Sequence, residues 1–312
     1  MIQRFQMGCC CAVLVAIGFA GCVPGDSGGG GGLGSFNRGF AFVRDRNIYV
    51  ADNSNYLNPI QLTTSGADQY PSLSRDGRRV VYVRGGNQLW VVPASNSPSP
   101  ARVQDTSGGT NYRTPVFSPD GNIIVFAYDL NGVSQFGRVN VDGTSFRALT
   151  SQFYFAGPSF FADGSAVLAV RATSPTRIYD RIVRVDVDSG MDSLIANSSI
   201  GSEACSVANR VSLSPDGRKV TFDAKTSSGG NCTGPVRIFV MDLFSGVVNR
   251  VTDYPANPSA DDGFPTWVGN DQVGFSSNYG GADQIYVLPA NMPPTSGGLK
   301  VPTASQPYYG PN

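Results

Sequence analysis

Residues 115–121 read PVFSPDG, and the alternating apolar run NIIVFAY follows directly at residues 122–128. Alternation with a period of two predicts a β-strand whose two faces meet different surroundings. In the turn before that strand, Pro119 presets φ, Asp120 accepts local backbone hydrogen bonds, and Gly121 adopts a left-handed conformation without steric cost. This stretch therefore predicts two antiparallel strands joined by a tight turn.

The same turn and strand recur along the chain, which indicates an internal repeat. The related turn strings are PSLSRDG (71–77), PVFSPDG (115–121), PSFFADG (158–164), VSLSPDG (211–217) and PTWVGND (265–271). Each string contains one strand and precedes three more, and the strings are 44, 43, 53 and 54 residues apart. Four short antiparallel strands in a repeat of about 40–50 residues are typical of β-propeller blades.

The two chain ends together supply a sixth unit. Residues 39–50 read GFAFVRDRNIYV, which predicts two strands with no first strand before them, and residues 60–63 supply the outermost strand. Residues 307–312 match the beginning of a turn string, with Tyr309 at the position of Leu73. Pairing of a C-terminal strand with the N-terminal half-blade would close the ring and leave no exposed inner edge. We therefore predict an all-β, six-bladed β-propeller of four-stranded antiparallel blades, closed in this way.

Two sets of repeated positions are expected to be structural. One apolar residue of each repeat should pack between neighbouring blades, with an aromatic ligand cage as the alternative: Leu73, Phe117, Phe160, Leu213, Trp267 and Tyr309. The repeated aspartates are interpreted as turn formers rather than catalytic carboxylates: Asp76, Asp120, Asp142, Asp163, Asp186, Asp216 and Asp242.

These repeats resemble the TolB-like propeller repeat, a relative of the WD40 repeat. The resemblance covers roughly residues 36–312, about nine-tenths of the chain, and implies six blades. TolB itself carries an α/β domain before its propeller, and that domain's N-terminal segment contacts the Tol inner-membrane machinery. A glycine-rich segment stands in that place in this sequence, so the resemblance does not carry over the Tol-specific role.

Residues 1–21 are predicted to be a bacterial lipoprotein signal peptide. Arg4 precedes 14 uncharged residues, 7–20, which are too few to span a bilayer but suit a secretory signal. The segment ends in Phe19-Ala20-Gly21-Cys22, which resembles a lipobox and implies lipidation of Cys22; a plain cleaved signal is the alternative. The residue after Cys22 is Val23 rather than Asp, which resembles the outer-membrane sorting pattern of enteric bacteria. We therefore expect an exported protein on the periplasmic face of the outer membrane, or on the cell surface.

Residues 22–35 are predicted to form a tether between that anchor and the propeller. The five glycines 28–32 have nothing to bury, so the segment should behave as a flexible chain with a reach of roughly 20 Å. A phosphate-binding glycine loop is excluded, because no predicted strand precedes the glycines and no predicted helix follows them.

The composition excludes several function classes. The chain of 312 residues has no histidine, which rules out Ser-His-Asp and Cys-His nucleophile pairs and His-ligated metals. Its 23 basic and 23 acidic residues balance, which argues against nucleic-acid binding. We predict no cofactor and no enzymatic activity, and we assign no metal site. Calcium bound by Asp-bearing loops stays open as an alternative, although the sequence has no EF-hand-like spacing.

Beyond the signal peptide and Cys22, the remaining cysteines are Cys205 and Cys232. Cys205 is expected in the loop before the first strand of the fifth blade, and Cys232 in the loop between that blade's second and third strands. Both loops should emerge on one face, and an exported chain favours a disulfide between them. A zinc site would need two further ligands, and the chain has no histidine to supply them.

The predicted binding site is the mouth of the central channel, where the innermost strands begin. The candidate residues lie just ahead of or within the starts of the turn strings: Asp68, Gln69, Tyr70, Asn111, Tyr112, Arg113, Phe153, Tyr154, Asn209, Arg210, Asp261, Asp262, Phe264 and Gln306. Aromatic rings with Arg and Asn are typical of protein and peptide recognition, and a solvated rim is the alternative. We predict a monomeric, envelope-tethered binding module for an envelope protein, peptide or glycan.

Two other functions stay open at this stage. A histidine-free glycosidase or lyase could use Asp, Arg and Tyr side chains, for instance a carboxylate pair built from Asp261 and Asp262. Adjacent residues on one loop rarely face each other across a substrate, which disfavours this pair. The third hypothesis is a structural envelope lipoprotein with no specific ligand.

Overall fold

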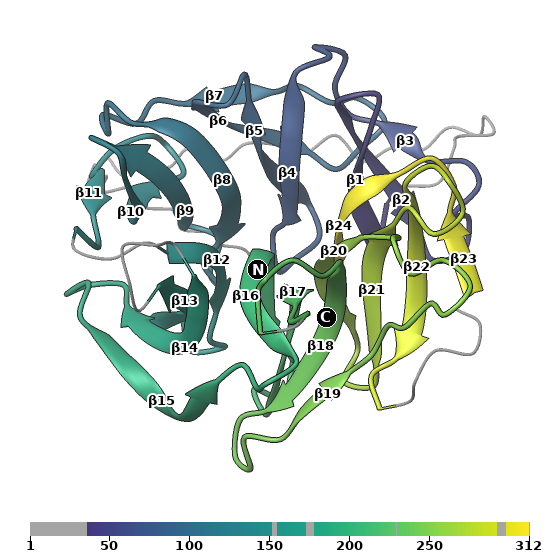
Figure 1. The fold of residues 1–312 in the computed structure, drawn as a ribbon. Helices are drawn as coiled ribbons and strands as arrows, with labels where there is room; N and C mark the ends of the chain where they lie inside the picture. The colour runs from purple at the N-terminus through teal and green to yellow at the C-terminus, as the bar shows by residue number, and fades with distance from the viewer. Residues whose placement is uncertain (1–35, 152–154, 173–177, 229, 292–297, 312) are drawn as a thin grey trace, which may run out of the picture. The chain divides into compact units, whose positions relative to one another are not determined.

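The computed structural model describes residues 36–151, 155–172, 178–228, 230–291 and 298–311. In this part of the chain, six four-stranded antiparallel sheets are arranged as the blades of a β-propeller (Figure 1). The predicted all-β, six-bladed fold is therefore confirmed. The predicted signal, Cys22 and the tether lie outside the described residues. No helix within the described ranges is long and apolar enough to cross a membrane.

Each blade has four strands, named below in order from the innermost to the outermost. Blade 1 contains β24 (Ser305–Gly310), β1 (Gly39–Arg44), β2 (Asn47–Asp52) and β3 (Ile60–Gln61); blade 2 contains β4 (Asp68–Leu73), β5 (Arg79–Arg84), β6 (Gln88–Pro93) and β7 (Ala101–Val103). Blade 3 contains β8 (Thr110–Phe117), β9 (Ile123–Leu130), β10 (Val133–Asn140) and β11 (Arg147–Ala148); blade 4 contains β12 (Phe155–Phe160), β13 (Ala166–Ala172), β14 (Tyr179–Asp186) and β15 (Asp192–Ser199). Blade 5 contains β16 (Ala204–Leu213), β17 (Lys219–Thr226), β18 (Val236–Asp242) and β19 (Val248–Arg250); blade 6 contains β20 (Asp262–Val268), β21 (Gln272–Ser277), β22 (Gln284–Pro289) and β23 (Gly298–Val301).

The two ends of the propeller sequence close the ring in blade 1. Strand β24 pairs antiparallel with β1, with Tyr309 opposite Phe40 and Gly310 opposite Gly39. The Tyr309 ring meets the Phe40 ring edge-on, with their centroids 5.1 Å apart. The predicted closure is confirmed, and in Figure 1 β24 lies beside β1 although they are the last and first strands of the chain.

Apolar clusters join each blade to the next, and each cluster includes one of the six predicted inter-blade residues. Trp267 of blade 6 is fully buried and packs with Ile238 and Val240 of blade 5. Its indole N–H also donates a hydrogen bond to the Ser212 carbonyl oxygen at 2.8 Å. The prediction of inter-blade packing is confirmed.

The repeated aspartates shape the turns, as predicted. Asp76 Oδ1 accepts hydrogen bonds from the Ser74 hydroxyl at 2.5 Å and from the Arg78 N–H at 3.1 Å. The hydrogen bond from Ser74 is the main cause of the lowered pKa of Asp76. Gly77 completes the turn with a φ of 71°, a conformation that costs glycine little. The other predicted aspartates likewise accept a backbone N–H two or three residues ahead: Asp120, Asp142, Asp163, Asp186, Asp216 and Asp242.

Cys205 and Cys232 form a disulfide in blade 5, as predicted. Their Cα atoms are 5.7 Å apart, and the two cysteines are 27 positions apart in the sequence. One detail of the prediction is wrong, because Cys205 lies inside β16 and not in the loop before it. The inner strand of blade 5 begins early, at Ala204, because Ala204 pairs with Thr226 at the far end of β17.

Removing this disulfide is expected to lower the unfolding free energy by about 3 kcal/mol, because a closed loop of this length restricts the unfolded chain. Urea unfolding of a Cys205→Ser, Cys232→Ser double variant measures the loss. A reductant should destabilise the wild-type protein by a similar amount and leave the double variant unchanged. Identical electrophoretic mobility of the wild type with and without reductant would contradict the disulfide.

Candidate binding site at the two ends of the central channel

The inner strands share a bulge near the end at which they begin. In five of the blades the residue before a proline has a positive φ, and the strand register shifts at that point. These residues are Tyr70, Thr114, Gly157, Phe264 and Gln306. A bulge leaves a residue unpaired in the ladder, and proline suits the next position because it has no N–H to satisfy. A residue followed by proline near the start of each repeat therefore indicates the position of a β-bulge.

Blade 5 forms its bulge differently, because Val211 stands where the other blades have proline. The Asp223 carboxylate of β17 satisfies the freed N–H groups of Asn209 at 3.0 Å and Arg210 at 2.9 Å. It also accepts the Asn209 side-chain amide at 2.6 Å and, from blade 6, the Phe264 N–H at 3.1 Å. Asp223 is fully buried, and burial raises its pKa while these donors act in the opposite direction. Sequence reasoning missed Asp223, although a lone acid in the apolar run 218–224 was a usable signal.

We call the end of the channel at which the inner strands begin the start end. Three of the predicted residues come together at this end: the Tyr70 and Phe264 ring centroids lie 5.9 Å apart, and the Arg210 guanidinium lies over the Phe264 ring. Arg210 is 2% exposed, and its guanidinium lies 5.7 Å from the Phe264 ring centroid and 5.4 Å from that of Tyr308. It donates a hydrogen bond to the Pro307 carbonyl oxygen at 2.7 Å, and burial lowers its pKa to about 10. Buried side chains therefore occupy the channel at this level.

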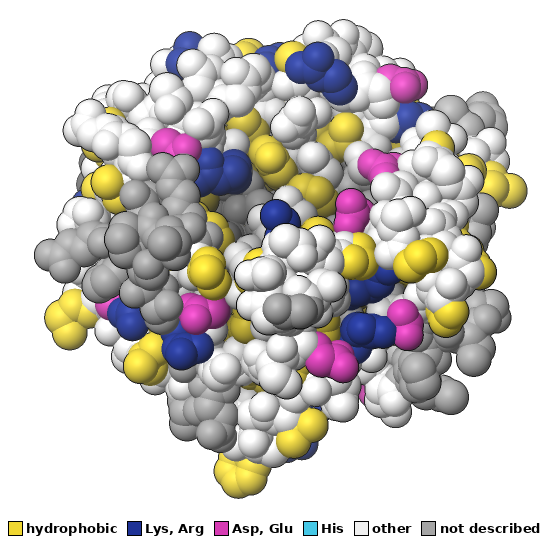
Figure 2. Space-filling view, in the orientation of Figure 1, with side chains coloured by type: hydrophobic (Ala, Val, Ile, Leu, Met, Phe, Trp, Pro, Cys, Tyr) yellow, Lys and Arg dark blue, Asp and Glu magenta, His cyan; other side chains and the backbone are white. Residues whose placement is uncertain are grey.

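Other predicted residues are engaged in pairs away from this cluster. Asp68 is fully buried and forms an ion pair with Arg84 at 2.7 Å. Arg113 pairs with Asp129 at 2.9 Å. Tyr112 is buried in the apolar cluster between blades 2 and 3 and does not face the channel. Figure 2 shows acidic and basic side chains close together at several points around the central hollow of one face of the molecule.

The remaining predicted residues differ in exposure. Gln69 is partly buried in β4, and Asn111 is exposed and donates from its side-chain amide to Asp129 at 3.0 Å. Gln306 accepts the Tyr70 N–H on its side-chain oxygen at 2.7 Å, which links blades 1 and 2. Asp261 is exposed and accepts the Val236 N–H at 2.8 Å. Phe153 and Tyr154 lie outside the described residues.

Asp262 is a buried carboxylate rather than a group on an open rim. It is 3% exposed, and the nearest guanidinium nitrogen, from the equally buried Arg237, lies 4.0 Å away. Neither carboxylate oxygen has a hydrogen-bond partner of good geometry among the described residues. Burial raises the pKa of Asp262 to about 6, although nearby hydroxyl groups and Arg237 act in the opposite direction. A substrate could not reach this carboxylate without a rearrangement of the surrounding side chains.

The raised pKa predicts a pH-dependent stability difference between the wild type and Asp262→Asn. The folded wild type binds a proton more tightly than the unfolded chain, so ionisation of Asp262 destabilises the fold as pH rises from about 4 to about 6. Between pH 4 and pH 7, the variant should gain about 2 kcal/mol relative to the wild type. Urea unfolding of both proteins across this range measures the change, and a constant difference would contradict the assignment.

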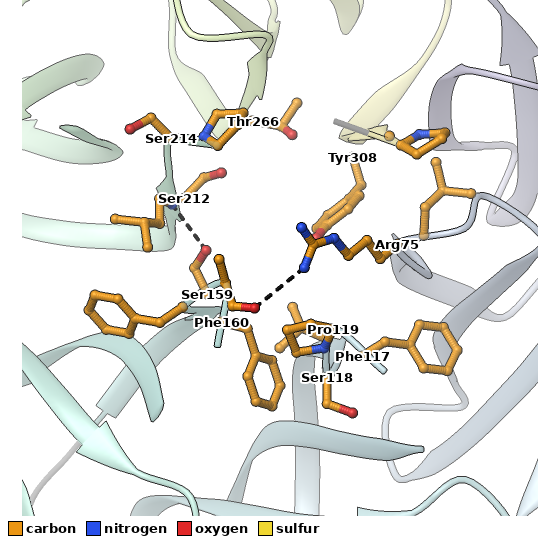
Figure 3. Close-up of a pocket in the computed structure, with 18 of the residues that line it drawn as sticks. Arg75, Phe117, Ser118, Pro119, Ser159, Phe160, Ser212, Ser214, Thr266 and Tyr308 are labelled. Carbon is orange, nitrogen blue, oxygen red and sulfur yellow. Dashed lines mark hydrogen bonds between the residues drawn. The ribbon is translucent and has the colours of Figure 1, made fainter. Parts of the chain in front are cut away.

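We call the other end of the channel, where the inner strands end in their turns, the turn end. A cavity of about 420 Å³ lies at this end, lined by residues from all six blades. Tyr308 of β24 and Arg75 of the blade 2 turn both extend into this space (Figure 3). Tyr308 contacts Arg210 on its other side, so the two ends of the channel are separated by packed side chains. Sequence reasoning placed its candidates at the start end and did not identify this cavity.

Most polar groups around the cavity are engaged in the fold. The Ser159 hydroxyl accepts the Leu213 N–H at 3.0 Å, and the Thr266 hydroxyl accepts the Tyr309 N–H at 3.1 Å. The carboxylates that border the cavity, Asp163 and Asp216, bind their own turns, and those hydrogen bonds lower their pKa values. In the described ranges, no three acidic or cysteine side chains cluster as metal ligands. The two carboxylates at the border of the cavity are thus held by hydrogen bonds within their own turns.

Comparisons with known proteins agree on the fold. No protein-family model and no curated sequence matches the chain. A protein from Agrobacterium tumefaciens assigned as a TolB superposes with a TM-score of 0.61 at 19% identity, over 85% of this chain and 89% of that one. TolB from Acinetobacter baumannii also has a TM-score of 0.61, at 17% identity over 88% of this chain and 67% of that one.

A peptidase also shares the fold. A puromycin-hydrolyzing peptidase from Mycobacterium tuberculosis gives a TM-score of 0.53 at 14% identity. The match covers 81% of this chain but only 41% of the peptidase. Because proteins of different activities share one fold, this structural similarity indicates the fold of the chain and does not indicate its activity. In its architecture, the chain is a six-bladed β-propeller that shares its fold with these two TolB structures.

Proposed function

We propose that this protein is an envelope-tethered, non-catalytic binding module that recognises a protein, peptide or glycan partner at its central channel. The turn-end cavity carries the proposal. It is within the range of about 300–1,000 Å³ that small-ligand pockets occupy, and its walls combine aromatic rings with hydroxyl groups. Its bordering carboxylates are bound within turns, which supports recognition over acid–base chemistry.

The alternative of a glycan-active enzyme has less support from the geometry. Asp261 accepts a backbone N–H, and Asp262 is 3% exposed beside Arg237. Turnover of an envelope polysaccharide that is lost in Asp262→Asn would favour the enzyme instead.

The envelope location is the second part of the proposal. It rests on the lipobox-like residues Ala20, Gly21 and Cys22 and on the glycines that follow. In a bacterial expression host, the wild type should fractionate with membranes and incorporate labelled palmitate. Cys22→Ala should do neither, and labelling that persists in this variant would contradict lipidation.

Site-specific photocrosslinking in the full chain tests where a partner binds. A photoreactive residue at Pro215 reports on the turn end, and one at Gln69 reports on the start end. The same partner should crosslink from Pro215 and not from an exposed position on an outer strand, such as Leu194. Adducts from Gln69 alone would move the site to the start end, and no adduct from either end would contradict the binding function.

A further inference from the structure

Arg75 is unlike the residue at the same position of the other turns. The equivalent positions of the related strings hold Pro119, Ala162 and Pro215. Arg75 extends from the blade 2 turn across the cavity and donates a hydrogen bond to the Ala162 carbonyl oxygen in blade 4 at 3.3 Å (Figure 3). One guanidinium therefore spans a cavity whose other turns present uncharged residues at this position.

The charge of Arg75 is not matched by an ion pair within the described ranges. The carboxylates of the neighbouring turns bind their own hydroxyl and backbone N–H groups, as Asp76 does with Ser74 and Asp163 does with Ser165. The hydrogen bond to Ala162 is long and goes to a neutral acceptor. The guanidinium is thus available to an anion that enters the cavity.

The walls around Arg75 combine hydroxyl groups with apolar and aromatic side chains. Phe117, Phe160 and Leu213 border the cavity, and Tyr308 extends into the same space as Arg75 (Figure 3). A fitting ligand therefore combines one negative charge with an adjacent apolar group. A carboxylate suits the charge, since it matches the planar fork of a guanidinium through two parallel hydrogen bonds.

We propose that the turn-end cavity binds the carboxyl-terminal end of a peptide chain, which deepens and rests on the binding function proposed above. The terminal carboxylate pairs with Arg75, and the last side chain packs against Phe160 and Tyr308. A chain terminus fits because it places a carboxylate and an apolar side chain on the same residue.

Fluorescence anisotropy with the full chain tests this site. The probes are the fluorescein-labelled peptide Gly-Ser-Gly-Val-Phe with a free carboxyl terminus and the same peptide as its terminal amide. The wild type should bind the acid at least about tenfold more tightly than the amide, because the amide removes the charge-assisted hydrogen bonds. Arg75→Gln should abolish this preference. Arg78→Gln, which changes an exposed arginine of the same turn that does not line the cavity, should preserve it.

Several results would overturn the proposal. They are equal binding of acid and amide by the wild type, binding of neither, or an acid preference that persists in Arg75→Gln. Competition by 3-phenylpropionate as strong as that by the unlabelled peptide would show that a free acid suffices, which overturns the peptide assignment. Crosslinking from Pro215 without any acid preference would reject the carboxylate site and leave the binding function standing.

Discussion

A chain that lacks residues 305–312 is expected to lose the folded propeller, the largest effect predicted for this molecule. Strand β24 is the inner strand of blade 1, and its removal exposes the edge of β1 and the ring of Phe40. It also removes Tyr309, which donates its N–H to Thr266 of blade 6 at 3.1 Å. Circular dichroism during urea titration should show no cooperative transition.

Two point variants of Tyr309 measure how much its side chain contributes to this loss of stability. Tyr309→Ala deletes a side chain that is 4% exposed and should cost about 3–5 kcal/mol. Tyr309→Phe keeps the ring and loses the hydroxyl that accepts from the Asn53 amide at 2.6 Å, which should cost about 1 kcal/mol. A synthetic peptide of residues 305–312 should restore a transition to the truncated chain. A truncated chain that unfolds like the wild type would show that ring closure is dispensable.

Asp223→Ala is expected to cost about 4 kcal/mol, because buried N–H groups that lose their acceptor carry a penalty of about 1–3 kcal/mol each. Four donors from Asn209, Arg210 and Phe264 converge on this one carboxylate. Removing a fully buried charge returns part of that cost, which keeps the net effect below the sum of the four. Urea unfolding monitored by tyrosine and tryptophan fluorescence measures the loss.

The matched control is Asp223→Asn, which keeps the shape but turns one acceptor oxygen into a donor. It should also be strongly destabilising, because an amide N–H would face backbone N–H groups. Asp163→Ala, at an exposed turn of blade 4, should leave a transition close to that of the wild type. A loss below about 1 kcal/mol in Asp223→Ala would mean that the blade 5 bulge does not depend on this carboxylate.

Much of the fold was readable from short stretches of sequence. The Ser74–Gly77 turn and its relatives could be predicted locally, because their hydrogen bonds join residues two to five positions apart. Tyr309 could be placed beside the N-terminal half-blade because residues 307–312 repeat a turn string. The start of β16 was misplaced, because its pairing with the end of β17 depends on partners about 20 residues away.

The candidate site was predicted less completely. Tyr70, Arg210 and Phe264 do come together, yet Arg210 is buried between two rings and does not line an open mouth. The side-chain direction of Tyr112 was also mispredicted. The preceding residue, Asn111, has a positive φ, and the Tyr112 side chain packs into the apolar cluster between blades 2 and 3. Side-chain direction at a bulge does not follow the simple alternation of a strand.

Local chemistry in the chain was enough to specify the repeat, the turns, the six blades and the pairing of the two ends. The alternation of apolar and polar residues and the turn residues determine structure over only a few positions, and both recur in each repeat. The closed start end, the convergence of donors on Asp223 and the cavity beneath Arg75 came from the assembled ring alone. Each of these features depends on contacts between residues of different blades. Asp223 and Phe264, for example, are 41 positions apart in the sequence, and a local sequence pattern cannot predict a contact over such a separation.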